Sequence, residues 1–259
     1  MIFGINTAHA AGDGISIHLA PEVLGHFFGI PLTNTLIMTW FVMALLLVLV
    51  ITLKSRLSLI PGKLQSVAEI IVGGGMDYME SALESRELAK KYFTLIMTIF
   101  IFILALNWVG LLPGVDSIGI VGNVHGEEKL IPFLHPANTD LNITISFAII
   151  AFFAIEIIGI MSLGFMKYGS KFINFSSPLA FLIGIIELIS ELARLVSFSF
   201  RLFGNIFAGK TLLVIAIFFA PFILPVPILA FEMFVGVIQA FIFAVLTLFF
   251  IKLAVQEPH

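Results

Sequence analysis

The sequence has no cysteine and few charged residues. Without cysteine, neither a disulfide framework nor thiolate chemistry is possible. Lysine, arginine, aspartate and glutamate together make up 11% of the 259 residues, whereas soluble domains average about 25%. Hydrophobic residues reach 60%, and the mean hydropathy is +1.14. The composition therefore predicts a membrane protein with several spanning segments and no nucleic-acid partner.

The motifs of common catalytic sites are also missing from the sequence. Gly73-Gly74-Gly75 is followed by no Gly-Lys-Ser/Thr and preceded by no strand pattern, so it does not predict a phosphate loop. The polar loop at 114–140 contains histidines and acids, but no His-Glu-x-x-His spacing. There is no Gly-x-Ser-x-Gly nucleophile elbow either. We expect no cofactor, no metal ion and no covalent chemistry in this chain.

Apolar runs of membrane-spanning length alternate with polar segments. We expect an outer segment at 1–30, spans at 35–53, 92–112 and 141–166, an interfacial cytoplasmic helix at 61–91, an outer loop at 114–140, and two long apolar arms at 178–220 and 222–253. Lys54, Arg56 and Lys63 follow the first span, so the positive-inside rule places the N-terminus outside and the C-terminus in the cytoplasm. The first ten residues lack the pattern of a signal peptide.

The last two arms are too long for simple crossings. At 1.5 Å per residue each exceeds a hydrocarbon core of about 30 Å, so either each arm breaks or both lie strongly tilted. Pro221, Pro225 and Pro227 mark the turn between them. The predicted fold class is an all-α integral membrane protein with about five passes, the last two forming a tilted hairpin.

An arginine lies deep in the first of these arms. Charge inside a bilayer is costly, so Arg201 is a candidate functional residue. At 100° per residue, five polar side chains fall within an arc of about 80°, namely Glu187, Glu191, Arg194, Arg201 and Asn205. Glu191 can contact Arg194 one turn later. No acid lies three or four residues from Arg201, so we expect its counter-charge on another helix or subunit. Gly204 and Ala208 would let that neighbour approach closely.

Other intramembrane polar residues leave alternatives open. Glu232, Gly236 and Gln239 share a face of the second arm. Glu156, in the third span, is either a structural partner for another helix or part of an ion path. Lys210 either pairs with Glu232 across the hairpin or extends to the outer interface.

Two motifs in the last arms are specific. Residues 200–209, Phe-Arg-Leu-Phe-Gly-Asn-Ile-Phe-Ala-Gly, are followed at 239–243 by Gln-Ala-Phe-Ile-Phe. Together they closely resemble subunit a of the F-type ATP synthase. Asn107 with the Leu-Leu-Pro at 111–113, and the Thr-Asp-Leu-Asn at 139–142, also match the family in its order. The resemblance extends from about residue 20 to the end of the chain.

The resemblance implies a membrane stator subunit that works against a ring of c subunits. Ions would enter through one half-channel, ride on a ring carboxylate, and leave through another. The implied partners are the c-subunit ring, the peripheral stalk b subunits, the remaining ATP synthase subunits, the lipid bilayer, and protons or sodium ions. The implied location is the bacterial plasma membrane. The choice between proton and sodium stays open, because ligands on the ring set it.

The resemblance also assigns roles to individual residues. Arg201 matches the family's essential arginine, and Gln239 the glutamine that faces it. Glu232 matches an outer half-channel position, and Glu187 the acid on the cytoplasmic side. The candidate site residues are Arg201, Gln239, Glu232, Asn205, Glu187, Lys210 and Glu191. Lys210 departs from the family, in which an acid or a histidine is more common.

A guanidinium stays protonated at accessible pH, so Arg201 suits a fixed charge better than a proton relay. The alternative from another class is a stand-alone secondary ion transporter or channel, which also uses midplane charges. The sequence shows no inverted repeat, and the predicted number of spans is odd. Both features favour the stator.

Overall fold

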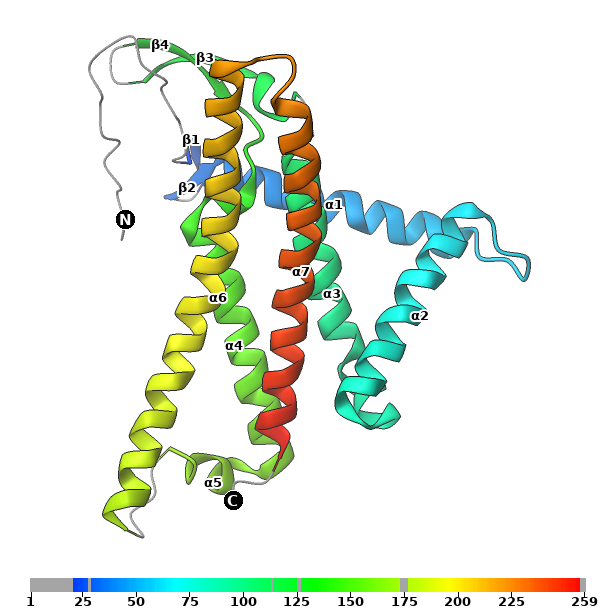
Figure 1. Cartoon of the computed structure of the whole chain (residues 1–259), viewed down its shortest axis with the longest axis vertical. Coiled ribbons are helices and arrows are strands. Elements are labelled where there is room, and N and C mark those ends of the chain that lie inside the picture. Colours follow the sequence, from blue (N-terminus) through cyan, green and yellow to red (C-terminus); the bar gives the residue numbers. More distant parts are fainter. Residues whose placement is uncertain (1–20, 28, 113, 125–126, 173–176, 257–259) are drawn as a thin grey trace. The chain divides into compact units, whose positions relative to one another are not determined.

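The computed structural model describes residues 21–27, 29–112, 114–124, 127–172 and 177–256 (Figure 1). In chain order the elements are β1 (Val23–Phe27), β2 (Ile30–Thr33), α1 (Asn34–Ser55), α2 (Lys63–Leu83), α3 (Arg86–Gly110), η1 (Val115–Ser117), β3 (Gly119–Val124), β4 (Glu127–Pro132), η2 (Ala137–Thr139), α4 (Leu141–Leu163), α5 (Phe165–Gly169), α6 (Pro178–Phe219) and α7 (Pro225–Val255).

Five helices are long and apolar enough to cross a membrane, namely α1, α3, α4, α6 and α7. This confirms the predicted fold class. Two short antiparallel hairpins, β1–β2 and β3–β4, were not predicted. They lie at the end of the expected outer N-terminal segment and within the expected outer loop. Most of that N-terminal segment, residues 1–20, lies outside the described residues.

Two predicted boundaries differ from the structure. The expected helix at 61–91 ends at Leu83, because Glu84 adopts a left-handed conformation with φ 55°. The Ser85 hydroxyl then accepts a hydrogen bond from the Leu88 amide (3.4 Å) and caps α3. Helix α3 therefore begins at Arg86, before the start of the expected span at 92–112. Likewise α4 ends at Leu163, before the expected residue 166, because Gly164 takes a positive φ of 82°.

The two last helices are unbroken. α6 has 42 residues and α7 has 31, with the connection at residues 220–224. A rise of 1.5 Å per residue gives lengths of about 63 and 46 Å, well beyond a hydrocarbon core of about 30 Å. Of the two sequence-based alternatives, breaking is excluded, and tilt is how a bilayer accommodates such helices. The two helices touch, since the rings of Phe198 and Phe243 lie 4.8 Å apart.

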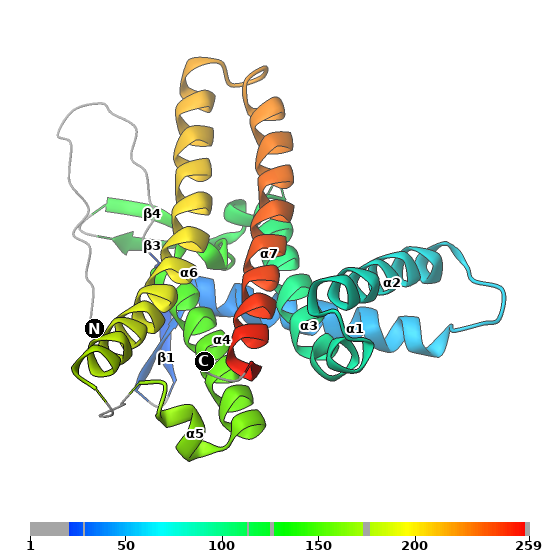
Figure 2. The same cartoon turned by 60° about the horizontal axis from the view of Figure 1, so that its bottom comes forward.

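The helices contribute to two compact units. Unit 1 comprises Met1–Leu45, Ile103–Thr144 and Arg201–Gln239, and unit 2 comprises Leu46–Phe102, Ile145–Phe200 and Ala240–His259. In unit 2 an apolar core joins α2, α3, α4 and α7, and both views show α2 beside the beginning of α3 (Figures 1 and 2). Unit 1 is joined by buried polar contacts, such as the hydrogen bond that the Thr35 hydroxyl donates to Asp140 Oδ2 (2.8 Å).

Candidate functional site

Arg201 lies on an exposed face of α6. Its neighbour Leu202 is completely buried, and Ile206 is nearly so, which defines the inner face of the helix in unit 1. Arg201 and Ala208 are exposed, and a Cβ added at Gly204 would meet no atom within 4 Å. The guanidinium therefore shares an open face with small residues. That arrangement suits close approach of another helix.

The two amide side chains of the candidate set are only partly satisfied. Asn205 Nδ2 and Gln239 Nε2 are both buried, and neither has a hydrogen-bond partner among the described residues. Leaving a buried donor unpaired costs about 1–3 kcal/mol, so such groups normally bind water or a partner molecule. Each of these two donors in unit 1 could therefore take a hydrogen bond with water or with a partner molecule.

Glu232 is buried against the backbone of α6. The side chain is 4% exposed and belongs to a face of α7 that also buries Gly236 and Gln239, as their spacing predicted. A Cβ built at Gly209 would lie 2.0 Å from Glu232 Oε2. The carboxylate thus occupies the space that glycine leaves free on α6.

An asparagine pair connects α3 to this face of α7. Asn107 Nδ2 donates to the carbonyl of Gly236 (3.0 Å), and Asn138 Nδ2 donates to Asn107 Oδ1 (2.6 Å). A small void of about 10 Å³ lies beside them and is also lined by Lys210. A void of that size holds about one water molecule. Asn107 belongs to the sequence match with the family, but nothing in the sequence indicates Asn138 as its partner.

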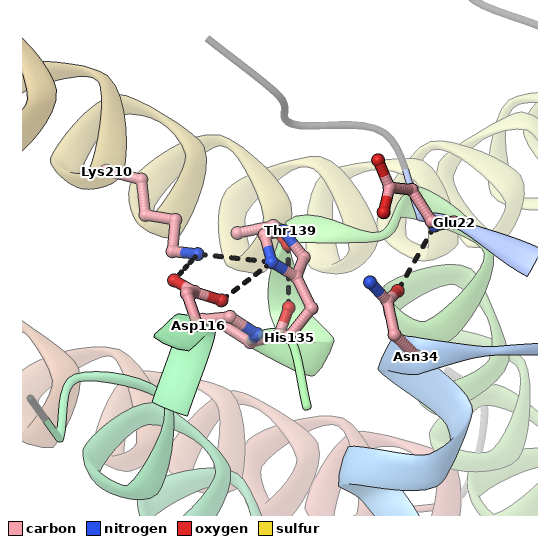
Figure 3. A network of polar contacts seen from close by, with 7 residues as sticks. Glu22, Asn34, Asp116, His135, Thr139 and Lys210 are labelled. Atoms are coloured by element: carbon pink, nitrogen blue, oxygen red, sulfur yellow. Dashed lines mark hydrogen bonds and ion pairs between the residues drawn. The ribbon is translucent and has the colours of Figure 1, made fainter. Parts of the chain in front are cut away.

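Lys210 of α6 pairs with an acid of the loop that follows α3. Its ammonium donates to Asp116 Oδ2 (2.9 Å) and lies 3.5 Å from His135 Nδ1, which in turn is 2.9 Å from Asp116 Oδ1 (Figure 3). Of the two alternatives, the ammonium thus pairs with a loop acid and not with Glu232, while its place at the outer interface stays a prediction. Asp116 reaches it from η1, which follows α3.

The charge state of Asp116 follows from its neighbours. Burial raises the pKa of this carboxyl, but the hydrogen bond to His135 and the Lys210 ammonium lower it by more. The net pKa lies below the ordinary value of 3.8. Asp116 is consequently ionised at neutral pH and carries the counter-charge for Lys210.

A second polar cluster lies in unit 2. Lys171 Nζ contacts Glu187 Oε1 (2.7 Å) and Glu191 Oε1 (3.3 Å). Arg194 donates to Glu191, which confirms the predicted pair, and stacks over the ring of Phe250 at 3.6 Å from its centroid. A cavity of about 310 Å³ is lined by all five residues. Lys171 was not among the candidate site residues, because nothing in the sequence indicates it as the partner of both acids.

Tyr168 of α5 closes the wall of this cavity. It packs so tightly on α4 that a Cβ at Gly159 would lie 2.3 Å from its ring. Burial, followed by the charge of Glu156, raises the pKa of the Tyr168 hydroxyl well above its usual range. Tyr168 is therefore neutral at any accessible pH. Glu156 Oε1 is buried as well.

The side chains that could bind a metal ion are not grouped into a metal site among the described residues. Among the residues that the structure describes, no three histidines or acids gather in a way that could hold an ion. The polar groups instead form two charge-paired clusters, one in each unit.

Comparison with known proteins identifies the family. Residues 36–252 match the family model described as ATP synthase A chain. The chain belongs to the ATP synthase A chain family. It is 34% identical over 223 residues to "ATP synthase subunit a 3" of Pelobacter propionicus, covering 85% of this chain and 87% of that one. It is 32% identical over 234 residues to the subunit a of Moorella thermoacetica, covering 90% and 96%. It is 35% identical over 218 residues to the subunit a of Campylobacter curvus, covering 83% and 88%.

The resemblance inferred from the sequence motifs is thus confirmed. As a member of this bacterial family, the chain is a multi-pass membrane protein, the ion-translocating stator subunit of the ATP synthase. Membership favours the stator over a stand-alone transporter.

Proposed function

We propose that Arg201 is the charge gate between two half-channels that this subunit forms with a ring of c subunits. The observation that carries the proposal is the exposed position of Arg201 on α6. Along α6, Arg201 comes after Glu187, Glu191 and Arg194 and before Lys210. Each of those flanking groups belongs to a polar, charge-paired cluster.

The cytoplasmic half-channel would pass through the cavity of unit 2. Its volume of about 310 Å³ exceeds what one water molecule needs by a wide margin, so it can hold a chain of water. Glu187 and Glu191 supply negative charge that favours a cation there, while Lys171 and Arg194 keep both acids neutralised in the resting state. Glu187 and Glu191 would therefore act where the ion leaves the half-channel for the cytoplasm.

The outer half-channel would pass along the buried face of α7. Glu232 supplies the carboxylate that can take up and release an ion, and Gln239 supplies an amide donor with no partner among the described residues. Asn107 and Asn138 line the neighbouring void. Asn205 brings a second partly satisfied amide from α6. Together these groups can order water without carrying a fixed charge.

The chemistry of arginine explains the gate. Its guanidinium remains charged, so it repels a cation that would cross directly from one half-channel to the other. The same charge attracts a carboxylate of the ring and favours release of the ion bound there. At about 4 Å, and with the effective dielectric typical of proteins, such an attraction is worth about 4 kcal/mol.

The proposed orientation places the N-terminus outside and the C-terminus in the cytoplasm. Lys54, Arg56 and Lys63 support this, because basic residues concentrate on the cytoplasmic side. The proposed partners are the c ring, the peripheral stalk b subunits and the other ATP synthase subunits. The transported ion is a proton or a sodium ion.

The proposal predicts a clear phenotype for Arg201→Ala. In membrane vesicles with the whole complex, ATP-driven ion pumping should fall to background while the soluble head still hydrolyses ATP. Passive ion leak should rise, because the charge barrier between the half-channels is gone. Arg86→Ala is the matched control, since that arginine is 68% exposed and has only a 3.9 Å contact with Glu80. Unchanged coupled pumping in Arg201→Ala would refute the gate.

A further inference from the structure

Lys210 stands next to the proposed ion-carrying carboxylate but does not pair with it. It directly follows Gly209, against which Glu232 packs. Its ammonium turns instead to Asp116 and His135, which lie on the loop between α3 and α4 (Figure 3). The proposed function did not use this cluster.

An ammonium beside Glu232 would be harmful to the proposed ion path. An opposite charge within about 4–6 Å favours the ionised form of a carboxylate by about ten- to a thousandfold. Lysine is flexible, with four methylene groups, and would reach for the nearest unpaired acid. Paired in that way, Glu232 could neither take up nor release an ion readily.

We propose that Asp116 and His135 are positioning residues that hold Lys210 away from Glu232 and so keep Glu232 available to the transported ion. The proposal rests on the assignment of Glu232 to the outer half-channel. It concerns only groups of unit 1, all of which the structure describes.

The geometry of the cluster supports a firm hold. Asp116 uses both of its carboxylate oxygens, one toward Lys210 and one toward His135, each at 2.9 Å. The side chains of Lys210 and His135 are only 13% and 8% exposed, so water competes weakly for these two groups, whereas Asp116 is 46% exposed and keeps contact with solvent. His135 begins a buried stretch in which Thr139 donates to the carbonyl of Pro136 (2.6 Å, Figure 3), which fixes the loop locally.

Another nearby acid already has its own partners. Asp140 Oδ2 accepts from the hydroxyl of Thr35 (2.8 Å), and its Oδ1 accepts from the backbone amide of Asn142 (2.8 Å). Its two oxygens are thus engaged by neutral donors. Asp116 is the acid that the fold presents to Lys210, and Glu232 packs against Gly209, the residue that precedes this lysine.

A double-mutant experiment tests the proposal. ATP synthesis driven by an imposed ion gradient is measured in vesicles with the whole complex, normalised to assembled complex, for Asp116→Asn, Lys210→Gln and the double variant. We expect Asp116→Asn to lose at least about tenfold in rate, because the released lysine pairs with Glu232. The double variant should return to the level of Lys210→Gln alone, because no ammonium then remains to be held.

The outcomes separate a positioning role from a structural one. If Asp116 only shapes the loop, the double variant will be as defective as Asp116→Asn, and the proposal is overturned. It is equally overturned if Asp116→Asn matches the wild type. His135→Asn should change the rate in the same direction as Asp116→Asn but by less, because Lys210 keeps its ionic partner.

Two further measurements distinguish this proposal from the one on which it rests. The first measurement is the ion concentration that gives half-maximal ATP synthesis, with the ion varied on the side of the 114–140 loop. In Asp116→Asn this concentration should rise about tenfold or more.

The second measurement is the activity of Glu232→Gln in the same series, which shows whether Glu232 carries the ion at all. If Glu232→Gln synthesises ATP normally, the outer half-channel assignment fails and this proposal fails with it. If Glu232→Gln is inactive but the double variant stays as defective as Asp116→Asn, only the positioning role of Asp116 and His135 fails. Glu84→Gln removes the 3.0 Å pair with Lys252 in unit 2 and serves as a control.

Discussion

At the scale of single residues, small side chains decide where the charged ones lie. Glycine at position 209 leaves room for the Glu232 carboxylate against α6. At Gly236 the limiting neighbour is Asn107, whose Cβ would lie 3.2 Å from an added methyl group. The positions of the Glu232 and Asn107 side chains in unit 1 therefore depend on Gly209 and Gly236, two helix glycines that have no side chain of their own.

Substituting one of these glycines should disturb function without preventing assembly. In Gly209→Ala the new methyl group overlaps the carboxylate of Glu232, which is the flexible end of its side chain and can turn aside. The backbone of α6 need not move, and alanine favours the helix by about 1 kcal/mol over glycine. We expect normal amounts of complex but a rate of ATP-driven pumping reduced by about tenfold or more, as for misplacement of a reacting group.

Gly73→Ala is the control for this prediction, because a Cβ at Gly73 meets nothing within 4 Å. The measurement is fluorescence-monitored pumping in vesicles, with subunit content determined by immunoblot. Pumping at the wild-type rate in Gly209→Ala would show that the position of the Glu232 carboxylate does not matter.

At the scale of elements, a structural feature could be predicted from the sequence when the residues that form it lie close together in the chain. The five spanning helices were evident because apolar length is a property of consecutive residues, and the Glu191–Arg194 pair because it lies within one turn. The two β-hairpins were missed, since backbone pairing in short strands leaves little trace in the side-chain pattern. The pair of Lys210 with Asp116, 94 residues apart, could not be predicted. Only the fold brings such distant residues together.

The short helix α5 illustrates an element held by a single fitted side chain. Tyr168 is 3% exposed and fills a notch that Gly159 leaves on α4. In Gly159→Ala the methyl group would overlap the aromatic ring, which cannot bend aside as a flexible chain can. Overpacking of this kind costs about 1–3 kcal/mol.

We therefore expect Gly159→Ala to lower the thermal stability of the complex in detergent and to open the wall of the unit 2 cavity. The measurement is thermal unfolding followed by tryptophan fluorescence, again compared with Gly73→Ala. A melting temperature equal to that of the control would mean that α5 is not docked through Tyr168.

At the scale of the whole molecule, the proposed function makes this chain one part of an ion path that is completed by a partner. The proposed gate residue, Arg201, is exposed, and so are many large apolar residues of α6, such as Leu192, Val196 and Phe200. Lipid accounts for exposed apolar residues in a membrane protein, whereas an exposed guanidinium near the middle of a spanning helix marks a candidate functional position. Under the proposed function, the carboxylates and apolar surface of a ring of c subunits would face this side of α6.

The incompleteness leads to a prediction for the isolated chain. Purified and inserted alone into lipid vesicles, it should conduct neither protons nor sodium ions, because no ring carboxylate carries the ion past the positive charge of Arg201. The measurement is the decay of an imposed ion gradient, compared at equal protein density with vesicles containing the complete membrane sector. Conduction by the chain alone that disappears in Glu232→Gln would instead show a self-sufficient channel, and would return the stand-alone transporter as the better description. The same vesicles with Arg201→Ala give the matching control, since any leak that appears only in this variant shows that the guanidinium itself forms the barrier.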